Sequence, residues 1–403
     1  MNNDKIVGLA LPWLIAISAF SLALHSDQFH PKPFDVIALA TGVLALTNKD
    51  IMENIIAVWP RIKYYLRYFL ILVVGLVVAQ VAQVGSGGIV NPGPLFVNYA
   101  RVFFNFYALL LFAVLTLCAR SRSLASWAIL ISPVLALPAL LGDYREGVLI
   151  DGGRLAGFFQ TPILFTIFAA TAFLIGLGVL LDSEKRWQRL ILSAWLAIIA
   201  NFILWSASRP AWLSLAACLL LWFFRAYFKK DYRVAKYIIL VPLTTFFVGY
   251  LLLPNSEYLK IKPWVERRAV TAVVNPLANQ AHTKIWPRSL NDVMSNPLGL
   301  GLDRRTSAST NTFLEVWLGG GIIALVAFSL ILTEIGRDVR IAMAASEYSS
   351  LSNLETSLLL VAVVFAINIF FTDAFLLRYF WAIGGIVLGV CWQKRLLLDA
   401  GQK

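Results

Sequence analysis

The chain has 403 residues, of which 59% are hydrophobic and only 14% are charged. A soluble protein carries about 25% charged residues, so the composition excludes an ordinary soluble domain. Runs of about 18 or more apolar residues recur along the chain, and each is long enough to cross the hydrocarbon core of a bilayer. The sequence therefore predicts an all-α protein, a polytopic bundle of transmembrane helices.

We expect about twelve spans, which form a single membrane domain over residues 1–403. The first run is long and is followed by no small-residue cleavage site, so we expect no cleavable signal peptide. The segment at 49–68, after a short second span, has the amphipathic pattern of a helix lying at the membrane surface. The expected spans are 6–24, 34–48, 66–84, 96–118, 124–142, 158–181, 189–207, 210–228, 237–254, 311–334, 356–374 and 376–393.

Positive charge indicates the orientation, because lysine and arginine are enriched on the cytoplasmic side of membrane proteins. With a cytoplasmic N-terminus, both termini lie inside and most of the 34 basic residues fall on cytoplasmic segments. The net charge of +12 thus reflects topology, and we expect no nucleic-acid partner. The three cysteines and three histidines have neither disulfide-framework nor metal-site spacing, so we expect no metal and no cofactor.

Basic residues on the outer side need another explanation, because the topology rule disfavours them there. Many lie in residues 255–310, the one large extramembrane segment, whose prolines and polar pattern predict one or two short amphipathic helices. This loop is too short to have a core of its own, and we expect it to cap a cavity at the periplasmic end of the bundle. The remaining outer-side basic residues are Lys32, Arg101, Arg145, Arg154, Arg209 and Arg378.

Two of these arginines are candidate binding residues. Arg154 lies in "DGGRLAGFFQTP" just before a span, and Arg209 lies in "WSASRPAW", a tight reversal between two spans. An arginine within the membrane costs about 2–3 kcal/mol or more without a partner, and its planar fork matches phosphate oxygens. The alternative for each is a position at the interface or an ion pair with Asp143, Glu146 or Asp151.

The loop contributes His282 and Arg288, in "HTKIWPRSL". His282 is either a solvated loop residue or a base or phosphate donor. We expect Arg288, next to Pro287, to open a helix and to act in the site. Arg304 and Arg305 are expected to be solvated or to contact lipid headgroups.

The stretch "STNTFLEVWLGGGIIALVAF" (309–328) begins like a loop and ends like a span. Thr310 and Asn311 are good N-cap residues, and the positive end of the helix that they start is suited to an anionic group. Glu315, one turn further, either favours the helix dipole, pairs with an outer arginine or accepts a proton. The glycines at 319–321 are expected to allow close packing.

Together these segments resemble the O-antigen ligase/polymerase superfamily of bacterial envelope glycosyltransferases. "RLAGFFQTP" is similar to the family's Arg-Gly-Phe-Asn-Pro segment, and "SASRPAW" is similar to its Ser-Arg-Gly-Ala-Trp segment. "NPLGLGL" followed by "STNTFLEVWLGGGIIAL" is similar to its Pro-Leu-Gly-Val-Gly and His-Asn-x-x-Leu-Glu…Gly-Ile-Ile-Gly-Leu segments. The resemblance rests on the order and sidedness of these pieces between residues 150 and 330, and the rest matches in hydropathy alone.

The resemblance implies a metal-independent inverting glycosyltransferase of the bacterial inner membrane, with its active site facing the periplasm. The donor would be a glycan on undecaprenyl pyrophosphate, and the acceptor would be lipid A-core or a second lipid-linked glycan, with membrane lipids as further partners. Outer arginines would hold the pyrophosphate as the glycosidic bond breaks. The residues of this chain implied in binding are Arg154, Arg209, Arg288, Thr310 and Asn311.

One departure concerns the catalytic base. Ligases of the family usually have histidine directly before the asparagine, and here that position is Thr310, which is no base near neutral pH. The catalytic candidates are therefore Glu315 and His282, with Arg288 as the loop arginine, although His282 itself holds the spacing before Trp286 where the family often has arginine. This departure favours the polymerases of the family, whereas chain length and the overall pattern favour the ligases.

Ligation of the glycan to lipid A-core is the leading prediction, and polymerisation of lipid-linked repeat units is the alternative. A transporter of a lipid-linked or anionic substrate is a further alternative, ahead of a channel or a structural membrane protein. Transporters often have an internal repeat and ionisable residues in mid-span. This sequence shows no clear repeat and has its ionisable residues at the span ends, which favours chemistry on one side of the membrane.

Overall fold

The computed structural model describes residues 3–22, 33–88, 91–137, 150–151, 154–156, 159, 161–253, 265–266, 270, 280–302, 311–345, 351–372 and 374–401. Most of them are helical. The elements are α1 (Asn3–Ser21), α2 (Pro33–Leu46), α3 (Lys49–Gly85), α4 (Pro92–Leu115), α5 (Ala119–Ile131), the 3-10 helix η1 (Ser132–Ala136), β1 (Ile150–Asp151), β2 (Arg154–Leu155), α7 (Pro162–Asp182), α8 (Arg186–Ser206), α9 (Arg209–Phe228), α10 (Tyr232–Leu251), α12 (Gln280–Ser295), α13 (Thr312–Ala344), α14 (Asn353–Asn368) and α15 (Arg378–Gly401).

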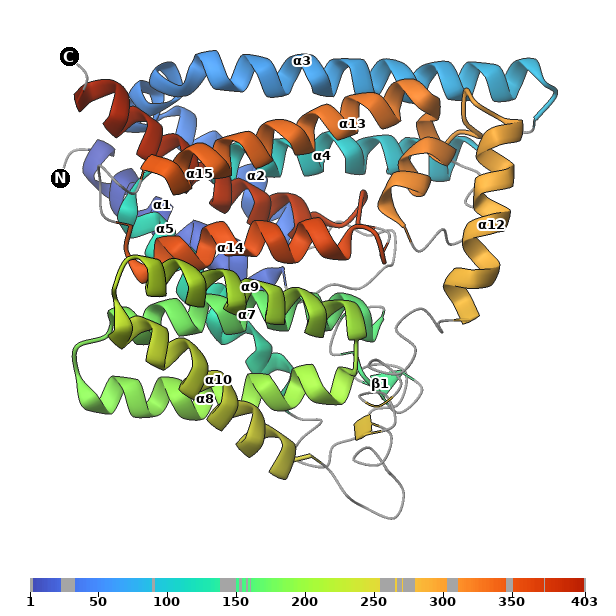
Figure 1. Ribbon diagram of the computed structural model, residues 1–403. Coiled ribbons are helices and arrows are strands. Elements are labelled where there is room, and N and C mark those ends of the chain that lie inside the picture. Colours follow the sequence, from blue (N-terminus) through green and yellow to red (C-terminus); the bar gives the residue numbers. More distant parts are fainter. Residues whose placement is uncertain are drawn as a thin grey trace.

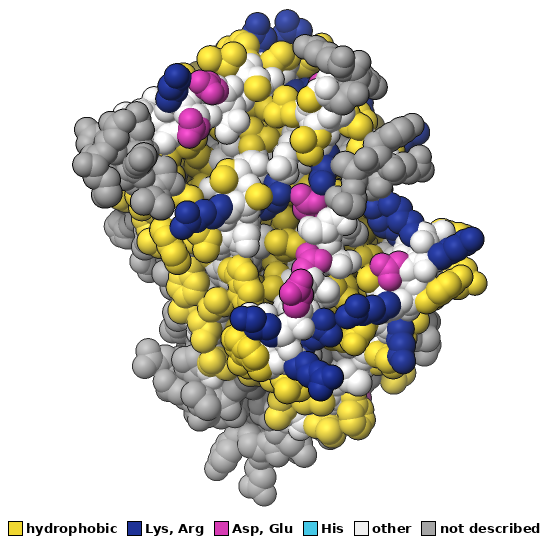
Figure 2. All heavy atoms as spheres, turned by 90° about the vertical axis from the view of Figure 1, so that its left-hand side faces the viewer, with side chains coloured by type: hydrophobic (Ala, Val, Ile, Leu, Met, Phe, Trp, Pro, Cys, Tyr) yellow, Lys and Arg dark blue, Asp and Glu magenta, His cyan; other side chains and the backbone are white. Residues whose placement is uncertain are grey.

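Most of the helices run roughly alongside one another between two ends of a bundle (Figure 1). Both chain termini lie at one end, which we call the terminal end, and α12 and the β1–β2 hairpin lie at the other, the loop end. Figure 2 looks onto the terminal end, where lysine and arginine side chains are spread between apolar ones. The arrangement agrees with the expected alternation, in which both termini share one side.

Eight helices in the described part of the chain are long and apolar enough to cross a membrane, as in multi-pass membrane proteins: α3, α4, α7, α8, α9, α10, α13 and α15. Shorter apolar helices occupy 10–21, 34–46 and 353–368. Each of the twelve expected spans overlaps one helix or helical segment of the bundle. The all-α class is confirmed, and the count of twelve spans stays a prediction.

The centre of the bundle is α7, whose buried residues cover nearly its whole length and circumference. A helix that is hydrophobic all round is expected to be surrounded by other helices, and α7 packs against α8 and α14. Thr161 caps its first turn by accepting a hydrogen bond from the Leu164 amide at 3.4 Å, and Pro162 follows at the first helical position. The central helix therefore begins directly after the segment that carries Arg154.

The segment 49–68 is not a separate surface helix. It continues without interruption into the next span as α3, a single helix of 37 residues that is about 55 Å long. Val58, Ile62, Tyr65 and Phe69 are buried on one face of it, and α3 packs along α13. The apolar stripe keeps its helical spacing through the expected boundary at residue 68, so the same helix face stays buried and the helix continues.

Buried charges at the terminal end are paired. Arg122 and Lys394 contact the two oxygens of Glu355 at 2.9 and 3.0 Å, which joins α5, α14 and α15. Asp338 on α13 accepts a hydrogen bond from the Tyr65 hydroxyl of α3 at 2.9 Å. Pairing of this kind is what buried charges within a membrane require.

At the loop end, α13 is broken at Gly321, which has φ 68° and ψ −171°. The segment 297–302 lies in this break: the Leu300 amide donates to the Leu318 carbonyl at 2.6 Å, and the Ile322 amide donates to the Pro297 carbonyl at 3.0 Å. The glycines expected to allow close packing do so on two sides: Gly320 faces Leu76 of α3, and Gly321 faces the backbone of Leu298. The break separates the first turns of α13 from its long inner part.

Replacing Gly321 with alanine is predicted to destabilise the protein by about 3 kcal/mol or more, because this backbone conformation is nearly restricted to glycine. The new Cβ would also lie 2.4 Å from the Leu298 carbonyl oxygen. The matched control is Gly336→Ala in the same helix, where a Cβ meets no atom within 4 Å and alanine should add about 1 kcal/mol. Thermal unfolding in detergent measures both, and an unchanged midpoint for Gly321→Ala would contradict the described break.

Candidate functional site

The elements that carry the predicted residues lie at the loop end (Figure 1). Arg154 lies on β2, Arg209 begins α9, Arg288 lies on α12, and Asn311 and Glu315 begin α13. Thr310, which the sequence placed in the site, lies outside the described residues. The backbone of His282 is part of α12, but its side chain is outside the described part of the structure.

The side chain of Arg154 forms hydrogen bonds with backbone groups of the protein. In the hairpin it pairs with Asp151 through the backbone, and its side chain donates to the Ser206 and Ala207 carbonyls at 2.9 and 3.4 Å. The Ser206 hydroxyl in turn donates to the Leu155 carbonyl at 2.6 Å. These carbonyls end α8, where free carbonyl groups and the negative end of the helix dipole favour a cation. Arg154 therefore fixes the hairpin to the end of α8.

Arg209 differs from Arg154 in having no such partner. It is half-buried at the first position of α9, and no described residue forms a hydrogen bond or an ion pair with it. The Ser208 side chain does not cap the helix, and its buried oxygen has no hydrogen-bond partner. A guanidinium and an uncapped helix start thus combine their positive charge at one place, which is suited to an anionic group.

The backbone of this junction is held in an uncommon conformation. Ala207 has φ 45° and ψ 50°, the left-handed region, although it is not glycine. This conformation costs about 1–2 kcal/mol for an ordinary residue, and strained residues cluster at functional sites. It turns the chain from α8 into α9 within two residues, so that Arg209 follows directly after the carbonyls that hold Arg154.

The polar start of α13 fastens this helix to the reversal at 369–377 between α14 and α15. Asn311 caps α13 by accepting from the Phe313 and Leu314 amides, and its amide group donates to the Phe370 carbonyl at 3.1 Å. Thr312 bonds to the same reversal through the Thr372 carbonyl and the Ala374 amide. Both the oxygen and the NH2 group of the Asn311 side chain therefore form hydrogen bonds within the protein.

Glu315 joins the same reversal with one oxygen. Its Oε2 accepts a hydrogen bond from the Phe375 amide at 3.2 Å, and the side chain is half-buried. A carboxylate has about four acceptor positions, so the Phe375 amide is one of several donors that Glu315 can accept. The hydrogen bond with the Phe375 amide is an observed role of Glu315, and pairing with an arginine and acceptance of a proton stay predictions.

Two hydrogen bonds at the end of α14 link the first turns of α9 to the start of α13. Asn368, the last residue of α14, donates to the Ser214 hydroxyl of α9 at 2.9 Å. The next residue, Ile369, accepts from the Thr312 amide at 2.9 Å. Ser214 lies five residues after Arg209, about 7.5 Å along the helix. The helix starts that carry Arg209 and Glu315 are thus positioned by one element, the end of α14.

The expectation that Arg288 opens a helix is wrong. The helix α12 begins at Gln280 and has Pro287 within it, and Arg288 is exposed in its second half. The apolar pattern extends upstream of the proline, so the helix begins before it. The ring of Trp286 lies 6.3 Å from that of Phe371, which places α12 against the same reversal that Glu315 contacts.

Sequence reasoning missed the partner of Arg378. This arginine, at the start of α15, forms a bidentate ion pair with Asp35 in the first turn of α2. The distance between its Nη2 and Asp35 Oδ2 is 2.7 Å. The pair explains an outer-side arginine without any ligand. The two residues are 343 positions apart, and no local pattern connects them.

Comparison with protein-family models and with curated proteins gave no match for this chain. In the described part of the chain, no three histidine, cysteine, aspartate or glutamate side chains gather where a metal ion could bind. The described polar groups at this site are Arg209, Glu315 and the starts of α9 and α13. Of the arginines at the loop end, Arg209 combines partial burial with the lack of a protein partner.

Replacing Arg154 with glutamine is predicted to lower the free energy of unfolding by about 1–3 kcal/mol, because buried carbonyls lose their donor. Replacing Arg209 with glutamine should leave stability unchanged or slightly higher, since no hydrogen bond within the protein is lost. Thermal unfolding of the two variants in the same detergent measures the difference. Equal losses in both would show that Arg209, too, is a structural residue.

Proposed function

We propose that the protein is an inner-membrane glycosyltransferase that moves a glycan from undecaprenyl pyrophosphate to an acceptor hydroxyl at the loop end of the bundle. Ligation to lipid A-core is the reaction that we favour. The observation that carries the proposal is Arg209, a half-buried guanidinium without a protein partner at an uncapped helix start. It lies in the segment "SASRPAW" that resembles a motif of the ligase/polymerase superfamily.

The chemistry of the leaving group explains why such an arginine is needed. As the bond between the sugar and the pyrophosphate breaks, negative charge develops on the phosphate oxygens. Donors fixed in advance where charge develops lower the barrier without reorganising during the reaction. Arg209 and the positive start of α9 supply this charge in the proposal, and we assign the exposed Arg288 of α12 to the same pyrophosphate as a second cation. Arg154 acts through its hold on the end of α8.

The attacking hydroxyl needs a base within hydrogen-bond reach, and Glu315 is the described residue that fits best. Its contact with the Phe375 amide holds the carboxylate in place, and in the proposal this carboxylate accepts the hydroxyl proton. The proton passes from the acceptor hydroxyl to the carboxylate as the new glycosidic bond forms. His282, the other candidate, is on α12, and its side chain lies outside the described residues.

Orientation follows from the charge distribution. Basic residues at the helix ends of the terminal end, seen in Figure 2, correspond to the cytoplasmic side under the positive-inside rule. The loop end then faces the periplasm, where both lipid A-core and lipid-linked glycans are acceptors in the superfamily. The segment 255–310 caps the site in this proposal.

Polymerisation of lipid-linked repeat units is the second candidate, favoured by Thr310 at the position where ligases usually have histidine. The test is transfer by the purified protein from undecaprenyl-pyrophosphate glycan, with and without lipid A-core. Product that requires lipid A-core supports ligation, and lengthening of lipid-linked chains in its absence supports polymerisation. No transfer by folded protein with a matched donor would contradict both and favour transport.

Within this assay, Arg209→Gln is predicted to lower the transfer rate by about 10²–10³-fold, the usual effect of removing one fixed donor to developing charge. Arg340→Gln, which removes an exposed arginine at the terminal end, is the control for charge and should retain the wild-type rate. A rate for Arg209→Gln within twofold of the control would contradict the role of Arg209.

Glu315→Gln separates catalysis from structure, because a glutamine oxygen still accepts from the Phe375 amide but no longer takes a proton. We expect the rate to fall by about 10²–10⁴-fold with an unchanged unfolding midpoint. If activity persists, the base is another residue, and His282→Gln is the variant to measure next.

A further inference from the structure

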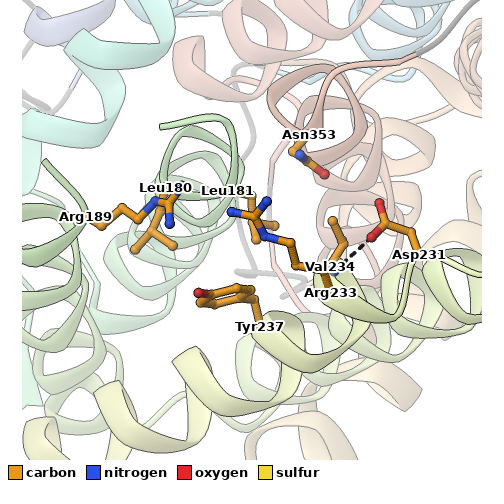
Figure 3. A pocket seen from close by; sticks show the side chains of 8 residues that line it. All are labelled: Leu180, Leu181, Arg189, Asp231, Arg233, Val234, Tyr237 and Asn353. Atoms are coloured by element: carbon orange, nitrogen blue, oxygen red, sulfur yellow. Dashed lines mark hydrogen bonds between the residues drawn. The ribbon is translucent and has the colours of Figure 1, made fainter. Parts of the chain in front are cut away.

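A second group of basic residues surrounds a pocket at the terminal end, opposite the candidate active site. The pocket has a volume of about 290 Å³ and lies between the last turn of α7 and the first turns of α8, α10 and α14. In Figure 3 the guanidinium groups of Arg189 and Arg233 point toward each other across it, and the Tyr237 ring lies beside them. Leu180 and Leu181 contribute an apolar wall.

Several donor groups that face this pocket form no hydrogen bond with a described residue. Arg189 uses its Nε to donate to the Ser183 carbonyl at 2.8 Å, and its two terminal nitrogens form no hydrogen bond with a described residue. No described residue bonds to the Arg233 side chain or to the Tyr237 hydroxyl either. The two guanidinium groups thus face each other, and each has N–H donors that form no hydrogen bond with a described residue.

The nearby carboxylates are engaged elsewhere. Asp231 caps α10 by accepting from the Val234 amide at 3.1 Å, and in Figure 3 it lies beyond Arg233 as seen from Arg189. Asp182 accepts from the Asn353 amide, the Asn353 side chain and the Leu354 amide at 2.8–3.1 Å. Neither carboxylate forms an ion pair with Arg189 or Arg233. Within the described structure, no carboxylate therefore neutralises the positive charge of these two arginines.

The depth of the pocket indicates where such an anion comes from. Arg189 and Arg233 lie in the first turns of two helices that are long and apolar enough to span a membrane, which is the depth of lipid headgroups. Leu190 and Ile191, directly after Arg189, are 72% and 61% exposed, as expected for side chains that face acyl chains. The start of α8 has no side-chain cap, so its dipole adds positive potential.

We propose that this pocket binds a phosphate group carried by the headgroup of an anionic phospholipid. Both guanidinium groups donate to the phosphate oxygens, the Tyr237 hydroxyl donates to a third oxygen, and the acyl chains lie along the exposed face of α8. The site is independent of the proposed transferase activity. It differs from general attraction of basic residues to the membrane, because it requires two particular arginines.

The test is native mass spectrometry of the full chain released from detergent with dioctanoyl phosphatidylglycerol, dioctanoyl phosphatidylcholine or inorganic phosphate. The variant is Arg189→Gln/Arg233→Gln, and the matched control is Arg186→Gln/Lys236→Gln, which removes two exposed charges from the same helices. We expect phosphatidylglycerol to bind more tightly than phosphatidylcholine, and its affinity to fall about tenfold or more in the pocket variant and less than twofold in the control.

Equal losses in the variant and its control would overturn the proposal, because binding would then depend on net charge. Equal affinity for the two lipids would overturn it as well. Binding of inorganic phosphate as tight as that of phosphatidylglycerol would contradict the assignment to a lipid. Arg233→Gln alone, which removes no hydrogen bond within the protein, guards against loss of folding and should by itself weaken binding of phosphatidylglycerol.

Discussion

The break of α13 at Gly321 is the constraint on which the loop end depends. Backbone groups inside a membrane protein must be satisfied within the protein, and a broken helix leaves some of them open. The segment 297–302 satisfies them through the Leu318 carbonyl and the Ile322 amide. The first turns of α13 then form a separate short piece that presents Asn311, Thr312 and Glu315 to the reversal between α14 and α15.

A second constraint is the cost of charge in an apolar environment. It explains why Arg378 pairs with Asp35, why Arg122 and Lys394 share Glu355, and why Arg154 holds the carbonyls that end α8. Against this background a half-buried arginine without a partner is an exception. Exceptions to local pairing are expected at functional sites, which is the reason to assign the anion to Arg209 rather than to its better-bonded neighbours.

Helices and their order were predictable from the sequence because apolar runs recur along the chain and basic residues flank them mainly at alternate connections. The continuity of α3 was also present in the pattern, since Ile62, Tyr65 and Phe69 keep one helical face across the expected boundary. The partners of Arg378 and Glu315 were not predictable, because both contacts join segments far apart in sequence. The role of Arg154 depends on backbone carbonyl groups. Every residue has such a group, so the sequence does not indicate which ones Arg154 contacts.

The role proposed for Arg209 requires that it bind the pyrophosphate of the donor lipid. Native mass spectrometry of the full chain with undecaprenyl pyrophosphate and with undecaprenol compares a lipid that carries the charged group with one that lacks it. We expect Arg209→Gln to weaken binding of undecaprenyl pyrophosphate about tenfold or more and to leave binding of undecaprenol unchanged. Equal affinity of wild type and variant for undecaprenyl pyrophosphate would contradict this role.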